Sequence, residues 1–95
     1  MKGPLTYRVE LASRRVEKQI LELPGDVRSR IARVMLELEE SPRPHGCQKL
    51  LDDIYRLRIG KYRIIYKVFD AEGLVLIGKV ARRSETTYRD VVHLF

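Results

Sequence analysis

The sequence predicts an α+β fold, in which helices precede a group of antiparallel strands. Apolar residues between Val27 and Leu38 recur at the spacing of one helix face, which indicates an amphipathic helix. Residues 55–69 instead form two β-rich runs joined by Gly60 and Lys61. A two-residue connection that begins with glycine is the signal of a type II′ hairpin. Since short turns also join the later strands, we expect antiparallel pairing among them.

The first forty residues are expected to form one strand and two helices. Apolar and polar residues alternate over 5–11, as they do in a half-buried strand. Helical spacing begins after Ser13, a favourable N-cap residue, and the Pro-Gly pair at 24–25 ends it. Asp26 is expected to cap a second helix that continues to Ser41. The tight turn between the helices favours an antiparallel helical hairpin that covers a flat surface.

The second half of the chain is expected to supply that surface as a three-stranded antiparallel meander. Two prolines and a glycine make residues 41–47 a loop. Strands are expected over residues 55–59, 62–69 and 74–80, because these runs are rich in β-branched and aromatic residues. Apolar residues over 84–95 follow a roughly helical spacing, so the chain should end in a short helix.

A length of 95 residues predicts a single domain, residues 1–95, with a shallow rather than a deep site. Nineteen Lys and Arg residues against thirteen Asp and Glu residues give a formal charge of +6. This balance favours a polyanionic partner, nucleic acid first. The single cysteine, Cys47, excludes an intramolecular disulfide and favours a cytoplasmic location. No apolar run is long enough for a signal peptide or a membrane span.

The two-residue turn also defines a cross-strand register, and this register separates two faces. Ile59 lies opposite Tyr62, and Arg58 lies opposite Arg63. The face expected to pack under the helices comprises Tyr55, Leu57, Ile59, Tyr62, Ile64 and Tyr66. The other face carries Arg56, Arg58, Arg63 and Lys67.

The opposed pair Arg58 and Arg63 points to a phosphate-binding face. Like charges directly opposite each other across strands cost a few tenths to about 1 kcal/mol. Guanidinium groups match the geometry of phosphate, and a bound polyanion would relieve the repulsion. The alternative is a solvated face, on which the arginine stems merely cover the sheet.

A second cationic cluster follows the last predicted strand. It contains Arg82, Arg83 and Arg89, with Tyr88 among them. In a meander the end of the last strand brings Arg82 near Arg63, and we expect Tyr88 to lie over the same basic face. The alternative for Tyr88 is a packing role in the terminal helix.

These segments together resemble the RelE/ParE toxin superfamily, and specifically its RelE branch. The resemblance covers nearly the whole chain. Besides the N-terminal strand and the helical hairpin, it rests on Lys49-Leu50, Tyr55-Arg56-Leu57-Arg58, Gly60-Lys61-Tyr62-Arg63-Ile64-Ile65-Tyr66 and Arg82-(x)5-Tyr88. It implies a toxin of a type II toxin-antitoxin system that enters the A site of the 30S ribosomal subunit and cuts mRNA there.

The resemblance also implies the catalytic residues. The basic pair of RelE falls on Arg56 and Arg58, its phosphate-binding arginine on Arg63, its second catalytic arginine on Arg82 and its tyrosine on Tyr88. RelE itself has lysines at the positions of Arg56 and Arg58. Because arginine stays protonated, a proton transfer by this pair is not expected here.

Cleavage of RNA by its own 2′-hydroxyl requires a base, stabilisation of the phosphorane charge and a counter-charge at the leaving oxygen. Tyr88 is the candidate base, because neighbouring arginines would lower its pKa from about 10. No metal or other cofactor is expected, since His45 and His93 stand apart and Asp52-Asp53 is typical of a turn. Further RNA contacts are expected from Lys49, Lys67, Arg83 and Arg89.

A cognate antitoxin of the RelB kind is a second implied partner. We expect it to place an acidic or amphipathic segment on the basic face or on the apolar tail at Val91, Val92 and Phe95. Neither a membrane nor a small-molecule substrate is expected. Two other functions stay open, namely ParE-like inhibition of DNA gyrase and binding of RNA or the ribosome without cleavage.

Overall fold

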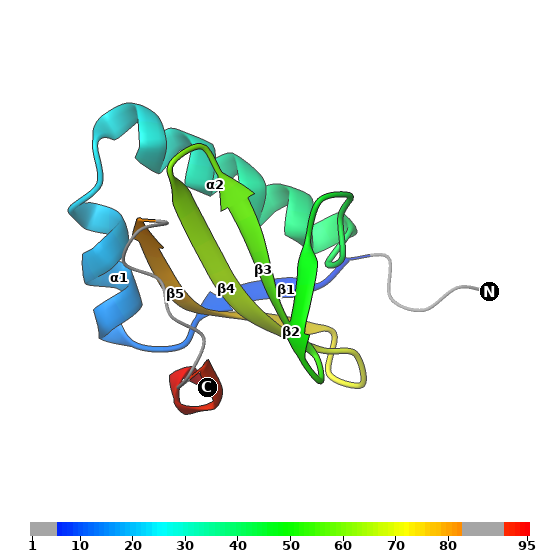
Figure 1. Ribbon diagram of the computed structural model, residues 1–95. Helices are drawn as coiled ribbons and strands as arrows, with labels where there is room; N and C mark the ends of the chain where they lie inside the picture. Colours follow the sequence, from blue (N-terminus) through cyan, green and yellow to red (C-terminus); the bar gives the residue numbers. More distant parts are fainter. Residues whose placement is uncertain (1–5, 83–90) are drawn as a thin grey trace.

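Two helices cover one face of a five-stranded sheet in the computed structural model, which describes residues 6–82 and 91–95 (Figure 1). The predicted α+β fold is therefore confirmed. The elements are β1 (Arg8–Leu11), α1 (Arg14–Leu21), α2 (Gly25–Glu40), β2 (Gln48–Leu51), β3 (Ile54–Ile59), β4 (Tyr62–Phe69), β5 (Leu74–Arg82) and the 3₁₀ helix η2 (Val91–Leu94). None of the helices in this part of the chain is long and apolar enough to cross a membrane.

The strands lie in the order β1-β5-β4-β3-β2. The three long strands β3, β4 and β5 form the predicted antiparallel meander. β1 adds to it in parallel along the first four residues of β5. The two helices carry the chain across the sheet from β1 at one edge to β2 at the other. The first strand of the chain thus extends the sheet that the last strands build.

The edge strand β2 was not predicted. Its four residues, QKLL, show neither alternation nor β-branched side chains, so its strand conformation comes from pairing with β3. Asp52 and Asp53 form the turn between β2 and β3, as expected. Asp53 adopts a positive φ of 61°, a conformation that aspartate tolerates better than most residues.

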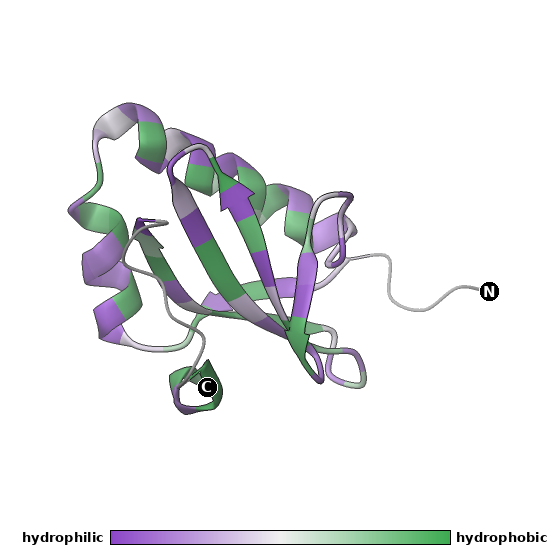
Figure 2. Cartoon of the chain, in the orientation of Figure 1, coloured by the Kyte–Doolittle hydropathy of each residue, from purple (hydrophilic) through white to green (hydrophobic). Residues whose placement is uncertain are grey.

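The register predicted for the β3–β4 hairpin is confirmed. Ile59 pairs with Tyr62, and Arg58 pairs with Arg63. Gly60 has a φ of 58°, whereas Lys61 has no positive φ, which is the pattern of a type II′ turn. Along β3, Figure 2 shows hydrophilic positions alternating with hydrophobic ones, so the two sides of the hairpin differ sharply in polarity.

The boundary between the two helices differs from the prediction. α1 ends at Leu21, and α2 begins at Gly25 with Pro24 as its N-cap, so Asp26 lies inside the first turn. There the aspartate faces the positive end of the helix dipole. Arg28 Nη1 donates to the carbonyl oxygens of Leu21 (3.3 Å) and Leu23 (3.4 Å), which supplies partners for the end of α1.

The main core lies between the helices and the sheet. Val16 of α1 and Ile31 and Leu38 of α2 are almost fully buried against it. The strand residues of this core are Tyr55, Ile59, Ile64, Tyr66, Val68, Val75, Ile77 and Val80. The face predicted to pack under the helices is therefore the one that does so.

A second, smaller apolar cluster lies on the opposite face of the sheet. There Val91 of η2 packs against Ile54 and Ile65, with Leu50, Leu94 and Phe95 around them. The predicted terminal helix is a single 3₁₀ turn in its described part, and residues 84–90 lie outside the described residues.

Gly78 makes the close packing of this terminal turn possible. A Cβ atom at Gly78 would lie 2.6 Å from the Phe95 ring and 2.9 Å from Leu94 Cβ. The same glycine lies in a β-bulge, because Tyr66 pairs with Ile77 whereas Ile65 pairs with Lys79.

The loop between α2 and β2 is anchored by one polar cluster. The Arg43 guanidinium donates two hydrogen bonds to the Asp70 carboxylate (2.8 and 3.1 Å) and one to Tyr55 Oη (2.7 Å). Tyr7 Oη donates to the same carboxylate at 2.8 Å. Tyr66, stacked on Tyr55, donates to the Pro42 carbonyl oxygen at 2.8 Å. The cluster ties the loop to the strands that form the main core.

The Gly78 contact predicts a large cost for a small change. Gly78→Ala forces a methyl group into the Phe95 ring, and overpacking of this kind lowers the free energy of unfolding by about 1–3 kcal/mol. Urea denaturation measures the change. Gly25→Ala is the matched control, because the nearest atom to its added Cβ is 3.9 Å away. Equal stability of the two variants would contradict the close packing.

Asp70 predicts an acid-dependent part of the stability. Hydrogen bonds from Arg43 and then Tyr7 hold the pKa of the Asp70 carboxyl below its ordinary value of 3.8. A depressed pKa gives stability that is present above the ordinary pKa and is lost as the pH falls through the folded value. Asp70→Asn should therefore lower the unfolding free energy at neutral pH, and the difference from wild type should shrink in strong acid. A difference that is independent of pH would contradict this role of the carboxylate.

Candidate nucleic-acid interface

The sheet face that points away from the helices is cationic. Strands β2 to β5 contain one, two, two and two Lys or Arg residues, seven in all, and no Asp or Glu. The cations on this face are Arg56, Arg58, Arg63, Lys67 and Lys79. On β1, Glu10 is already paired with Arg8 at 3.1 Å. In the described strands, therefore, no acid on β2 to β5 neutralises these cations.

Arg58 and Arg63 lie directly opposite each other near the hairpin turn. Arg58 is exposed and Arg63 is half-buried. The register thus places two like charges on directly opposed residues of one face, an arrangement that costs stability unless an anion offsets it.

Arg56 lies two residues further along β3, where it pairs with Gln48 of β2. Arg56 Nε donates to Gln48 Oε1 at 2.9 Å, and Arg56 Nη2 donates to the same oxygen. Arg56 is thereby held by a neutral acceptor. Gln48 was not singled out by the sequence, because its contact depends on the unpredicted strand β2.

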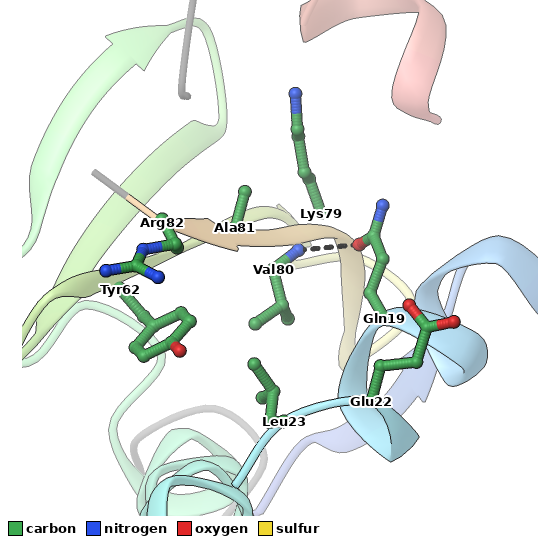
Figure 3. A pocket seen from close by; sticks show the side chains of 8 residues that line it. All are labelled: Gln19, Glu22, Leu23, Tyr62, Lys79, Val80, Ala81 and Arg82. Atoms are coloured by element: carbon green, nitrogen blue, oxygen red, sulfur yellow. Dashed lines mark hydrogen bonds between the residues drawn. The ribbon is translucent and has the colours of Figure 1, made fainter. Parts of the chain in front are cut away.

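Lys67 and Lys79 extend the cationic face over β4 and β5. Lys67 Nζ lies 5.0 Å from the centroid of the Phe69 ring, within reach of a cation–π interaction. Lys79 was missed by the sequence analysis. In an unbroken register it would face the helices with Ile64, but the bulge at Gly78 pairs it with Ile65 instead. Figure 3 shows Lys79 and Ala81 pointing away from Val80, in agreement with this shift.

Lys49 does not join these cations. It pairs with Tyr55, whose ring belongs to the main core, so Lys49 lies on the helix side of the edge strand. Its neighbour Gln48 occupies the position on the cationic face.

Arg82 ends β5 and pairs with Tyr62. Its neighbour Ala81 pairs with Arg63, so the prediction that Arg82 comes near Arg63 is confirmed for the backbone. The side chain of Arg82 nevertheless starts from the opposite face, since successive residues of a strand alternate. There it lines a hollow of about 420 Å³ together with Gln19, Glu22, Leu23, Tyr62, Lys79, Val80 and Ala81 (Figure 3). The Arg82 side chain therefore begins on the helix side of the sheet, at the end of β5 next to Arg63 on β4.

Three predicted site residues, Arg83, Tyr88 and Arg89, lie outside the described residues. The described chain fixes the two ends of their segment. Arg82 ends β5 beside the hairpin, and Val91 begins η2 on the same face as Arg56 and Ile65.

Comparison with known proteins agrees with this geometry. The sequence profile of the family described as ParE toxin of type II toxin-antitoxin system, parDE, matches residues 10–87. A curated relative from Methanocaldococcus jannaschii that bears the name toxin RelE1 is 30% identical over 85 residues, which cover 84% of this chain and 93% of the relative.

Solved structures show the same fold. The chain superposes with a TM-score of 0.74 on the RelE-RelB complex of Pyrococcus horikoshii OT3, at 30% identity over 85% of this chain and 99% of the other. An arginine-to-alanine double variant of Escherichia coli RelE in the free state gives a TM-score of 0.77, at 24% identity over 93% and 96%. The profile and the relatives, together with the fold, establish that the chain belongs to the RelE/ParE superfamily and is a RelE-like toxin of a type II toxin-antitoxin system.

Proposed function

We propose that this toxin is an endoribonuclease that cuts mRNA in the A site of the ribosome. The observation that carries the proposal is the opposition of Arg58 and Arg63 on a sheet face whose strands β2 to β5 have no acidic residue. Selection for stability alone disfavours such a pair. A phosphate substrate gives it a use, because guanidinium groups bind phosphate oxygens with paired hydrogen bonds.

The proposed reaction is attack of the 2′-hydroxyl on the adjacent phosphate. Arg56, Arg58 and Arg63 hold the phosphate and stabilise the charge that develops on the phosphorane. Tyr88 accepts the 2′-hydroxyl proton as the bond from the 2′ oxygen to phosphorus forms and the bond to the 5′ oxygen breaks. Arg82, next to Arg63 at the end of β5, stabilises the departing oxygen, which takes up a proton from solvent, and the products are a 2′,3′-cyclic phosphate and a 5′-hydroxyl. The arginines cannot serve as the base, since they stay protonated. The reaction requires no metal ion.

In the proposed reaction, the ribosome orients the reacting groups of the RNA, which an open sheet face cannot do by itself. A few arginines on an open sheet attract RNA without fixing the orientation of the 2′-hydroxyl and the leaving oxygen. A codon held in the A site presents both atoms in a constant geometry, which provides a large part of the catalytic advantage. Neighbouring RNA would contact Lys67, Lys79, Arg83 and Arg89, and Lys49 from the outer edge of β2. A toxin that acts on translating ribosomes would work in the cytoplasm.

A RelB-like antitoxin is the second proposed partner. The related structure from Pyrococcus horikoshii is a RelE-RelB complex. In this chain an acidic or amphipathic antitoxin segment would bind the cationic face or the apolar turn at Val91 to Phe95. Val92, which is 55% exposed on that turn, offers such a segment an apolar contact.

Inhibition of DNA gyrase is the alternative function, because the matching profile carries the name of the ParE toxins. The arginines would then contact a protein or DNA, and no RNA cleavage would occur. Binding of RNA or the ribosome without cleavage is a further outcome of the same test.

Mapping of 5′ ends on mRNA tests the proposal. Purified toxin and translating ribosomes should yield cuts within A-site codons, and a reaction without ribosomes should yield few. Tyr88→Phe removes the proposed base and should lower the cleavage rate by about 10²–10⁴-fold, the usual contribution of a general base. Full cleavage by Tyr88→Phe would refute the base assignment. No cleavage by wild type, combined with loss of DNA supercoiling by gyrase, would favour the alternative function.

Arg58 predicts opposite effects on stability and on cleavage. Arg58→Gln removes one of the two opposed charges and should raise the unfolding free energy by a few tenths to about 1 kcal/mol. The same change removes a phosphate contact, so cleavage should slow and the salt dependence of RNA affinity should weaken by about 0.7 in its log–log slope. Urea denaturation and RNA titration over a range of salt concentrations measure the two effects.

Arg33→Gln is the matched control for Arg58→Gln. It removes the same charge from an exposed position on α2, on the other layer of the molecule. It should leave both cleavage and the salt slope near wild type. Equal losses in the two variants would show that net charge, rather than the sheet face, determines RNA binding.

A further inference from the structure

Gln48 makes a specific contact on the cationic face. It stands directly opposite Arg56 across the β2–β3 pair. Its side-chain oxygen Oε1 accepts from Arg56 Nε at 2.9 Å and also from Arg56 Nη2. One oxygen thus accepts two hydrogen bonds from one edge of the guanidinium, which fixes the plane of that group as well as its position.

The chemical type of the acceptor matters. A carboxylate in this position would form an ion pair with Arg56 and compensate its charge, and it would repel an approaching phosphate. The amide oxygen of glutamine accepts the same hydrogen bonds and leaves the positive charge in place. The guanidinium has five donors, and the contact with Gln48 uses two of them.

The contact between Gln48 and Arg56 lies among other cations on the same face. Arg58 and Arg63 occupy the same face, so repulsion pushes a long, flexible arginine side chain outward. No carboxylate on strands β2 to β5 of the described chain opposes this repulsion. Two of the hydrogen bonds that hold the plane of the Arg56 guanidinium go to Gln48.

We infer that Gln48 is a positioning residue that holds the Arg56 guanidinium in the plane required for contact with the scissile phosphate. The inference rests on the proposed ribonuclease function. Gln48 acts through Arg56 and does not itself contact the reacting atoms. Its loss should therefore slow the chemical step more than it weakens the binding of RNA.

Two substitutions separate the acceptor from the charge. Gln48→Met keeps the length of the side chain but removes the acceptor, and it should lower kcat by about 10- to 100-fold with little change in KM, as expected for a misplaced catalytic group. Gln48→Glu keeps the acceptor but compensates the charge, so RNA affinity should fall and its salt slope should become smaller. Both variants should melt near the wild-type temperature, because Gln48 is exposed.

A measurement on the free protein, which requires no cleavage, completes the test. The Nε–H resonance of Arg56 in the free protein should be protected from exchange in wild type and in Gln48→Glu, and should lose this protection in Gln48→Met. Leu51→Gln is the control on the same edge strand, at a position that is 46% exposed. It should leave both the resonance and kcat unchanged.

The failure of the inference and the failure of the proposed function are distinguishable. Wild-type kcat in Gln48→Met, or an Arg56 resonance that is indifferent to that change, would overturn the positioning role while cleavage by wild type stands. Absence of cleavage by wild type would remove the proposed function and with it a catalytic purpose for Gln48. Parallel losses of kcat and melting temperature would assign Gln48 a structural role and overturn the inference.

Discussion

The register of the β3–β4 hairpin determines both the core and the cationic face. Gly60 takes the positive φ that the two-residue turn requires, and every pair from Ile59–Tyr62 outward follows from it. Side chains alternate along a strand, so a slip of one residue would bury the arginines and expose Tyr66. Burial of the core and exposure of the cationic face therefore depend on the same register. Any change that disturbs this turn would alter folding and function together.

Gly78 has a similar double role on β5. Its bulge shifts the register by one residue, which places Val80 in the main core and Lys79 on the cationic face. Its missing side chain also leaves room for Phe95 and Leu94 on that same cationic face. One residue thus joins the distribution of charge to the docking of the C-terminal turn. That turn lies on the face that carries Arg56, because Val91 contacts Ile65, the cross-strand partner of Arg56.

The elements that could be predicted from the sequence are those fixed by signals within their own segments. A two-residue turn fixes its own register, and a helical repeat needs only its own segment, so the hairpin and α2 were predictable. Strand β2 and the bulge at Gly78 depend on pairing with neighbours, and the contacts of Gln48 and Lys79 depend on these in turn. The cap of α2 at Pro24 rather than Asp26 depends on packing between two helices. For these reasons the arginines of the cationic face could be predicted, but not the contact of Gln48 with Arg56 or the place of Lys79.

In the described chain, the ion-paired aspartate Asp70 and the cationic face lie in different places. Acids that contribute to stability lie around Arg43, where Asp70 binds the guanidinium and Tyr7 and so anchors the loop after α2. Strands β2 to β5, which carry the cationic face, contain no acidic residue, and the main core lies on the other side of the same strands. An amide at Gln48 fits this division, since it orders an arginine without cancelling its charge. In the proposed function this absence of acids has a use, because an acid placed there to stabilise the sheet would compete with a phosphate substrate for the arginines.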